Sequence, residues 1–184
     1  MRRAVAGSSL PARTARQARA AVWCATAAAF VLFCVLFVPP ILESSTGAGP
    51  SWLRLAFAPL CHQLPERSFV LFGGPLAVCA RCTGLLLGGV LGLACAAWLV
   101  VGRERAVPRS WLAALVLPTA ADGALAVLGA SPLAELPRFL LAVPAGVAAG
   151  VLLAIGIYDL VWLITGDRVP VGCANPRRIV EESR

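Results

Sequence analysis

The single histidine of this 184-residue chain stands beside a cysteine, and a pair of cysteines follows 17 residues later. The motif reads Cys61-His62-Gln63 and then Cys79-Ala80-Arg81-Cys82. A C-x-x-C pair is a common chelating unit, and three thiolates with one imidazole form a known ligand set of tetrahedral zinc. We therefore predict a metal site, with zinc as the first candidate, whose ligands are Cys61, His62, Cys79 and Cys82. Because adjacent residues point in different directions on a regular element, Cys61 and His62 can both ligate only at a turn.

Two other interpretations of the same cysteines stay open. Cys79 and Cys82 stand where an apolar helix is expected to begin, and a helix N-terminus favours the reactive thiolate. The motif would then belong to a membrane thiol–disulfide oxidoreductase, with Cys79 or Cys82 attacking and Cys61 as the resolving thiol. The third interpretation is a structural or partner-binding membrane subunit in which a disulfide stabilises the loop.

The composition identifies the class of protein that carries this motif. Hydrophobic residues make up 59% of the chain and charged residues only 14%, and the mean hydropathy is +0.83. A soluble domain has about 25% charged residues, which it needs to cover its surface. These values exclude an ordinary soluble domain, a disordered chain and a disulfide-rich miniprotein, and they predict an integral membrane protein.

Four apolar stretches are long enough to cross a bilayer, which takes about 20 residues as a helix. Because no water satisfies the backbone inside a membrane, we predict an all-α polytopic membrane helical bundle. The chain divides into a basic tail, a four-span membrane domain and a second tail, at 1–19, 20–166 and 167–184. The predicted spans lie at about 20–42, 82–102, 110–134 and 139–166.

The apolar segment 68–80 lies between the first two spans and contains Gly73-Gly74-Pro75. At 13 residues it is too short to cross the membrane, so we predict a re-entrant or interfacial segment. Glu66 and Arg67, just before it, are expected to form a solvated pair in the loop.

The arginines predict how the spans are oriented. All 16 basic residues are arginines, and 12 of them lie in the segments 1–19, 103–109 and 168–184. The positive-inside rule places these segments, and so both termini, in the cytoplasm, and the protein in the cell membrane as a multi-pass protein. The arginines stand between apolar blocks, so we expect the lipid bilayer as a partner and no nucleic acid. The other four lie on the outer side with the cysteine motif: Arg54, Arg67, Arg81 and Arg138.

Asp122 is an acidic residue inside the third predicted span. A carboxylate there costs about 2.5–3.5 kcal/mol on insertion scales, so it should face the bundle interior and have a partner. Arg81 and Arg138 begin neighbouring spans on the same side, and either can reach it. An ion pair that fixes the packing and a role in proton or substrate handling are both open. Arg81 and Thr83 are expected to support the metal ligands.

Small residues predict how the helices pack. Gly84, Gly88 and Gly92 recur every four positions in the second span, and Gly146 and Gly150 do so in the fourth. Such stripes let helix backbones approach closely inside a membrane. They are expected to pack helix against helix, and a homo-oligomer through the same glycines is a further expectation.

Two blocks of the sequence resemble a known family. The run from Cys61 to Phe69, CHQLPERSF, and the run from Val78 to Gly84, VCARCTG, are similar to the bacterial and archaeal membrane proteins grouped as domain of unknown function 2085. Leu117-Pro118 through Asp122-Gly123, with Ser131 and Arg138, is similar to the second block of that family. The resemblance covers roughly residues 50–155. It implies a small multi-spanning membrane protein with a Cys/His motif, and it implies no particular activity.

Overall fold

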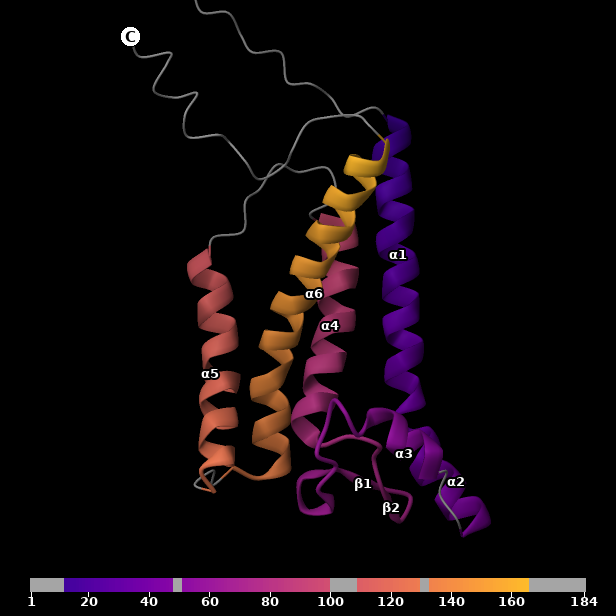
Figure 1. Ribbon diagram of the computed structural model, residues 1–184, viewed down its shortest axis with the longest axis vertical. Coiled ribbons are helices and arrows are strands. Elements are labelled where there is room, and N and C mark those ends of the chain that lie inside the picture. Colours follow the sequence, from indigo (N-terminus) through magenta and orange to yellow (C-terminus); the bar gives the residue numbers. More distant parts are fainter. Residues whose placement is uncertain (1–11, 48–50, 100–108, 130–132, 166–184) are drawn as a thin grey trace, which may run out of the picture.

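The protein is a bundle of long helices with short elements gathered at one end (Figure 1). The computed structural model describes residues 12–47, 51–99, 109–129 and 133–165. The long helices α1, α4, α5 and α6 alternate in direction, so the start of α1 and the end of α6 lie at the same end of the bundle (Figure 1). The elements are α1 (Ala12–Val35), α2 (Val38–Thr46), α3 (Ser51–Phe57), the 3-10 helix η1 (Pro65–Arg67), β1 (Val70–Leu71), β2 (Gly74–Pro75), α4 (Ala80–Leu99), α5 (Arg109–Val127) and α6 (Glu135–Thr165).

Three helical stretches among the described residues are long and apolar enough to span a membrane. They are Thr14–Ser45, Ala80–Trp98 and Glu135–Thr165. The third predicted span corresponds to α5, whose apolar part, Ala113–Val127, is shorter. The prediction of an apolar helical membrane protein is therefore confirmed, while the fourth span stays a prediction. The tail predicted at 167–184 lies outside the described residues, and the helix of the first span begins at Ala12, inside the predicted tail.

The first predicted span, 20–42, is not one straight helix. Tight turns in its C-terminal part, in which the N–H groups of Leu36 and Phe37 donate to the carbonyls of Phe33 and Cys34, end α1. Pro39 and Pro40 then stand in the first turn of α2. A proline lacks the N–H that an interior helical position needs, but the first turn does not use that group. The two prolines therefore begin a new helix and do not close the first one.

The segment 68–80 forms a short β-hairpin, which is a departure from the all-α prediction. β1 and β2 are antiparallel, with Leu71 opposite Gly74. Phe72 and Gly73 both have positive φ angles, of 53° and 86°. This combination is the two-residue type I′ turn, which matches the twist of paired strands. The re-entrant or interfacial position of the segment stays a prediction.

The elements between α1 and α4 form one packed unit, which we call the connecting segment (α2 through β2). Its core buries Leu36, Leu53, Phe57 and Leu76 together with Cys61. Arg54 ties three parts of it together: its Nη2 contacts Glu43 Oε2 at 2.8 Å and donates to the Pro75 carbonyl at 3.3 Å. The connecting segment therefore holds Cys61 against the start of α4.

The glycine stripes lie between α4 and α6 of the same chain. A methyl group at Gly84, Gly88 or Gly92 would overlap with a backbone carbonyl of α6. Methyl groups at Gly146 and Gly150 would overlap with carbonyls of α4 in the same way. The predicted close packing is thus found within one chain. A homo-oligomer through these glycines would have to compete with this contact, and it stays a prediction.

We expect Gly88→Ala to lower the free energy of unfolding by about 1–3 kcal/mol, because the added methyl group overlaps with the Val143 carbonyl and the site is already close-packed. Equilibrium unfolding in detergent measures the change. Gly156→Ala is the matched control, since a methyl group at this α6 position meets nothing within 4 Å. Equal losses in the two variants would mean that the α4–α6 contact does not limit stability.

Candidate metal centre

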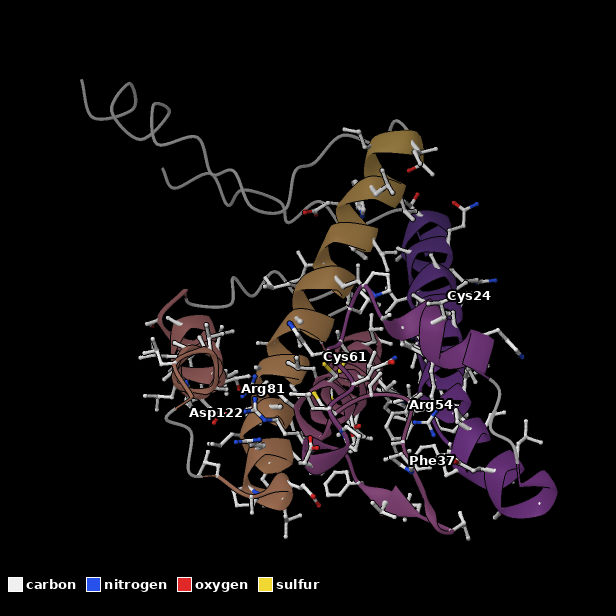
Figure 2. The ribbon with its side chains drawn as sticks, turned by 60° about the horizontal axis from the view of Figure 1, so that its bottom comes forward. Cys24, Phe37, Arg54, Cys61, Arg81 and Asp122 are labelled. Atoms are coloured by element: carbon white, nitrogen blue, oxygen red, sulfur yellow. The ribbon has the colours of Figure 1, made fainter. Side chains whose placement is uncertain are left out.

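Three of the four predicted ligands come together at the N-terminal end of α4. The sulfur atoms of Cys61, Cys79 and Cys82 all lie within 4.8 Å of one another. Cys61 follows α3, Cys79 immediately precedes α4 and Cys82 stands in its first turn. Figure 2 shows Cys61 at the meeting point of the connecting segment and α4. Among the described residues every cysteine is a free thiol.

Cys61 is the most buried of the three cysteines, with 5% of its surface exposed. Its Sγ accepts hydrogen bonds from the backbone N–H groups of Cys79, at 3.2 Å, and Gln63, at 3.5 Å. Hydrogen bonds from the thiols of Cys79 and Cys82, helped by these N–H groups, lower the pKa of the Cys61 thiol well below its ordinary value, although burial acts in the opposite direction. The surroundings of Cys61 therefore favour a thiolate at this cysteine, whereas the sequence suggested Cys79 or Cys82 as the attacking thiolate.

The three sulfurs fit a metal ion by chemistry and by spacing. A tetrahedral zinc ion with bonds of about 2.3 Å to sulfur separates two sulfurs by about 3.8 Å. The observed limit of 4.8 Å requires only small movements of the side chains to reach that value. Backbone N–H groups that donate to a thiolate, as at Cys61, are typical of the outer shell of metal–thiolate sites.

His62 does not join the three sulfurs. Its side chain is exposed, and it is absent from the group of ligand atoms that lie within 4.8 Å of one another. The chain does turn at this point, since Gln63 has a positive φ of 53°. The Cys61 side chain is buried after this turn, whereas the His62 side chain is exposed. The structure therefore brings together Cys61, Cys79 and Cys82, and it does not assemble the predicted Cys₃His set.

Thr83 supports the start of α4. Its Oγ1 donates to the Cys79 carbonyl at 3.1 Å, and its N–H donates to the same oxygen at 3.0 Å. The side chain is buried, and these two bonds fix the backbone between the two cysteines of the C-x-x-C pair.

Asp122 pairs with both of the arginines that the sequence offered as partners. Arg81 donates from Nε to Asp122 Oδ2 at 3.1 Å, and its Nη2 makes a second, short bond to the same oxygen. Arg138 Nε lies 3.9 Å from Asp122 Oδ1. Figure 2 shows Arg81 of α4 and Asp122 of α5 pointing toward each other. This triad (Arg81, Asp122 and Arg138) joins α4, α5 and α6, and Asp122 and Arg138 are both buried.

A pocket of about 510 Å³ lies over the sulfurs and the arginines of the triad. Arg67 also lines it and is half-buried, whereas Glu66 is exposed, and none of the ion pairs of the described residues joins the two. Arg67 stands in the run CHQLPERSF, but the sequence assigned it no part in the site, because its place depends on how η1 folds over α4. The described lining residues are Leu60, Cys61, His62, Gln63, Leu64, Arg67, Cys79, Arg81, Cys82, Gly123, Ala126, Val127 and Arg138.

We expect Asp122→Asn to lower the free energy of unfolding by about 3–5 kcal/mol, because it leaves two guanidinium groups at a buried position without their carboxylate. Unfolding in detergent measures the loss. Glu43→Gln breaks the more exposed pair with Arg54 and should cost about 0–1 kcal/mol. If the two variants are equally stable, the triad does not hold the bundle together.

Comparison with known proteins places these residues in a family. The chain is 35% identical over 78 residues to an uncharacterised protein of Methanocaldococcus jannaschii, a match that spans 42% of this chain and 50% of that one. It is 34% identical over 98 residues to an uncharacterised protein of Methanothermobacter thermautotrophicus, covering 53% and 87% of the two chains. No solved structure matches the chain. The family described as Predicted membrane protein (DUF2085) matches residues 61–153, from Cys61 to beyond Arg138, and the chain belongs to this family.

Proposed function

We propose that the protein is a metal-binding membrane protein whose ion, zinc in the first instance, is held at the outer face by Cys61, Cys79 and Cys82. The observation that carries the proposal is the convergence of these three sulfurs, from two distant parts of the chain, to within 4.8 Å. Only thiols, and no acidic residue, stand in this group, and thiolates favour zinc over the hard cations magnesium and calcium.

His62 supplies the fourth ligand in this proposal. It lines the same pocket as the three cysteines, and as an exposed side chain it is free of packing that would hold it outside. Rotation of the ring into the pocket as the ion binds would complete the Cys₃His set. Before that movement the fourth position opens toward the pocket, as in zinc sites that keep one position for water or a ligand.

We expect Cys82→Ser to abolish stoichiometric zinc, because it removes one of the three converging sulfurs. Elemental analysis of the purified protein, and the charge-transfer absorption of the cobalt-substituted form, measure the binding. Cys95→Ser is the matched control: it lies on the same helix and is exposed, away from the cluster. Zinc retained in Cys82→Ser would overturn the proposed site.

We expect His62→Ala to keep zinc at saturation but to weaken the affinity for zinc by about a hundredfold. The binding free energy of a structural zinc site is about 10–16 kcal/mol, and each of its ligands contributes several kcal/mol. Competition with a chelator measures the affinity. An unchanged affinity would exclude His62 and leave the fourth position to water or to a ligand in the pocket.

Thiol–disulfide exchange is the second candidate, and the low pKa of the Cys61 thiol favours it. Two of the three thiols would reduce a disulfide of a substrate protein, giving up two electrons and two protons and becoming a disulfide themselves. Thiol titration before and after reduction separates the candidates. Purified protein without metal and with a reducible disulfide supports exchange; zinc with free thiols supports the metal site; a protein with neither would be a structural or partner-binding subunit.

We also propose four spans, with α5 as the third, both termini in the cytoplasm and the sulfur cluster outside. In support, the beginnings of α1 and α5 and the ends of α4 and α6 lie at one end of the bundle (Figure 1), where Arg16, Arg19 and Arg109 stand. Exposed tryptophans at both ends, Trp52 at one and Trp98 with Trp111 at the other, suit the two membrane interfaces.

We expect a membrane-impermeant maleimide to label Ser45→Cys, at the outer end of α2, in intact cells, and to label Cys173 only after lysis. Peptide mass spectrometry measures the labelling of each cysteine separately. Labelling of Cys173 in intact cells would mean that the orientation is inverted.

A further inference from the structure

We propose that the pocket over the sulfur cluster is an anion site, which binds an oxyanion of the phosphate or carboxylate class through Arg67, Arg81 and Arg138. The three arginines reach the pocket from three elements, η1, α4 and α6. Among the described lining residues there is no aspartate or glutamate. The inference goes beyond the metal site and does not depend on whether the sulfurs hold an ion.

Arg67 is the clearest element of this site. It is half-buried against the pocket although it belongs to a loop, and in the described part of the chain its guanidinium makes no ion pair. A guanidinium that lines a pocket without a carboxylate partner keeps all of its charge for a ligand that enters the pocket. A bound anion would supply the counter-charge.

Arg81 presents a free edge to the same space. Its Nε and Nη2 groups donate hydrogen bonds to Asp122. Its Nη1 takes part in none of the hydrogen bonds of the described residues. Gly123, the next residue of α5, also lines the pocket, and a Cβ there would lie 3.8 Å from Nη1. Asp122 therefore holds the guanidinium in place, and Nη1 lies next to Gly123 at the lining of the pocket. A fixed, planar fork of this kind suits an oxyanion.

The volume of the pocket and the apolar residues at its rim indicate which ligands it can hold. The pocket of about 510 Å³ lies in the range of small-molecule sites, about 300–1,000 Å³. Leu60 and Val127 line its mouth and are exposed. The oxyanion can thus be a free ion or the headgroup of an anionic lipid whose chains lie along the apolar rim, and both sources offer the same charged oxygens to the arginines.

The test uses the full chain in nanodiscs of zwitterionic phosphatidylcholine, titrated with inorganic phosphate by calorimetry. We expect saturable binding of one phosphate per chain, weakened about tenfold or more in Arg67→Gln, because a hydrogen bond to a charged group is lost. Arg67→Lys, which keeps the charge without the fork, should fall between the two. Arg19→Gln, exposed at the far end of α1, is the matched control and should bind as the wild type does.

A second arm identifies the source of the oxyanion. In nanodiscs containing phosphatidylglycerol, loss of phosphate binding shows that the lipid headgroup occupies the site, and unchanged binding shows a site for a free anion; either result supports the proposal. No saturable binding of either probe, or equal affinities in the wild type, Arg67→Gln and Arg67→Lys, would overturn it. Zinc content separates the two proposals, since Arg67→Gln should keep zinc while it weakens phosphate binding.

Discussion

The backbone contact between α4 and α6 is the constraint on which the rest of the structure depends. Where glycines of one helix lie against carbonyls of the other, neither helix can slide or rotate without a clash. Gly84 lies against Phe139, so the first turns of the two helices stand at the same level. Arg81 and Cys82 stand just before Gly84, and Arg138 stands just before Phe139. The register of the two helices therefore places Arg81 and Cys82 next to Arg138. The packing of α4 against α6, and not the polar groups of the site, therefore brings these residues together.

The ion triad extends this arrangement to α5. Polar contacts join α5 to the other helices: Thr119 Oγ1 donates to the Leu141 carbonyl at 2.6 Å, and Asp122 pairs with the two arginines. The buried carboxylate of Asp122 pairs with two guanidinium groups, and a shift of α5 along its axis would break both ion pairs. The carboxylate therefore specifies where α5 lies against α4 and α6, which matters because α5 has the shortest apolar stretch of the four long helices.

Hydropathy and charge predicted the parts of the structure that the membrane dictates. Long apolar helices follow from the cost of exposing a backbone to lipid, and the pairing of Asp122 follows from the cost of an isolated carboxylate. The break at Leu36 was not predictable in this way, because Pro39-Pro40 is equally compatible with the end of one helix and the start of another. The position of Arg67 in the pocket and the exposed position of His62 were not predictable for a related reason: the surroundings of a loop residue depend on tertiary packing, which the local sequence does not show.

Asp122 also explains how arginines and thiolates can occupy one pocket without neutralising each other. Arg81 stands inside the C-x-x-C pair, where its guanidinium could have paired with a sulfur. Instead its hydrogen bonds go to Asp122, on another helix, and the sulfur of Cys61 receives backbone N–H groups. The carboxylate thereby keeps the cation away from the sulfurs. In the proposed metal site, a divalent ion on three thiolates would have a net charge of about −1. Arginines held nearby, but not bonded to the sulfurs, would stabilise that charge and could still bind the proposed anion.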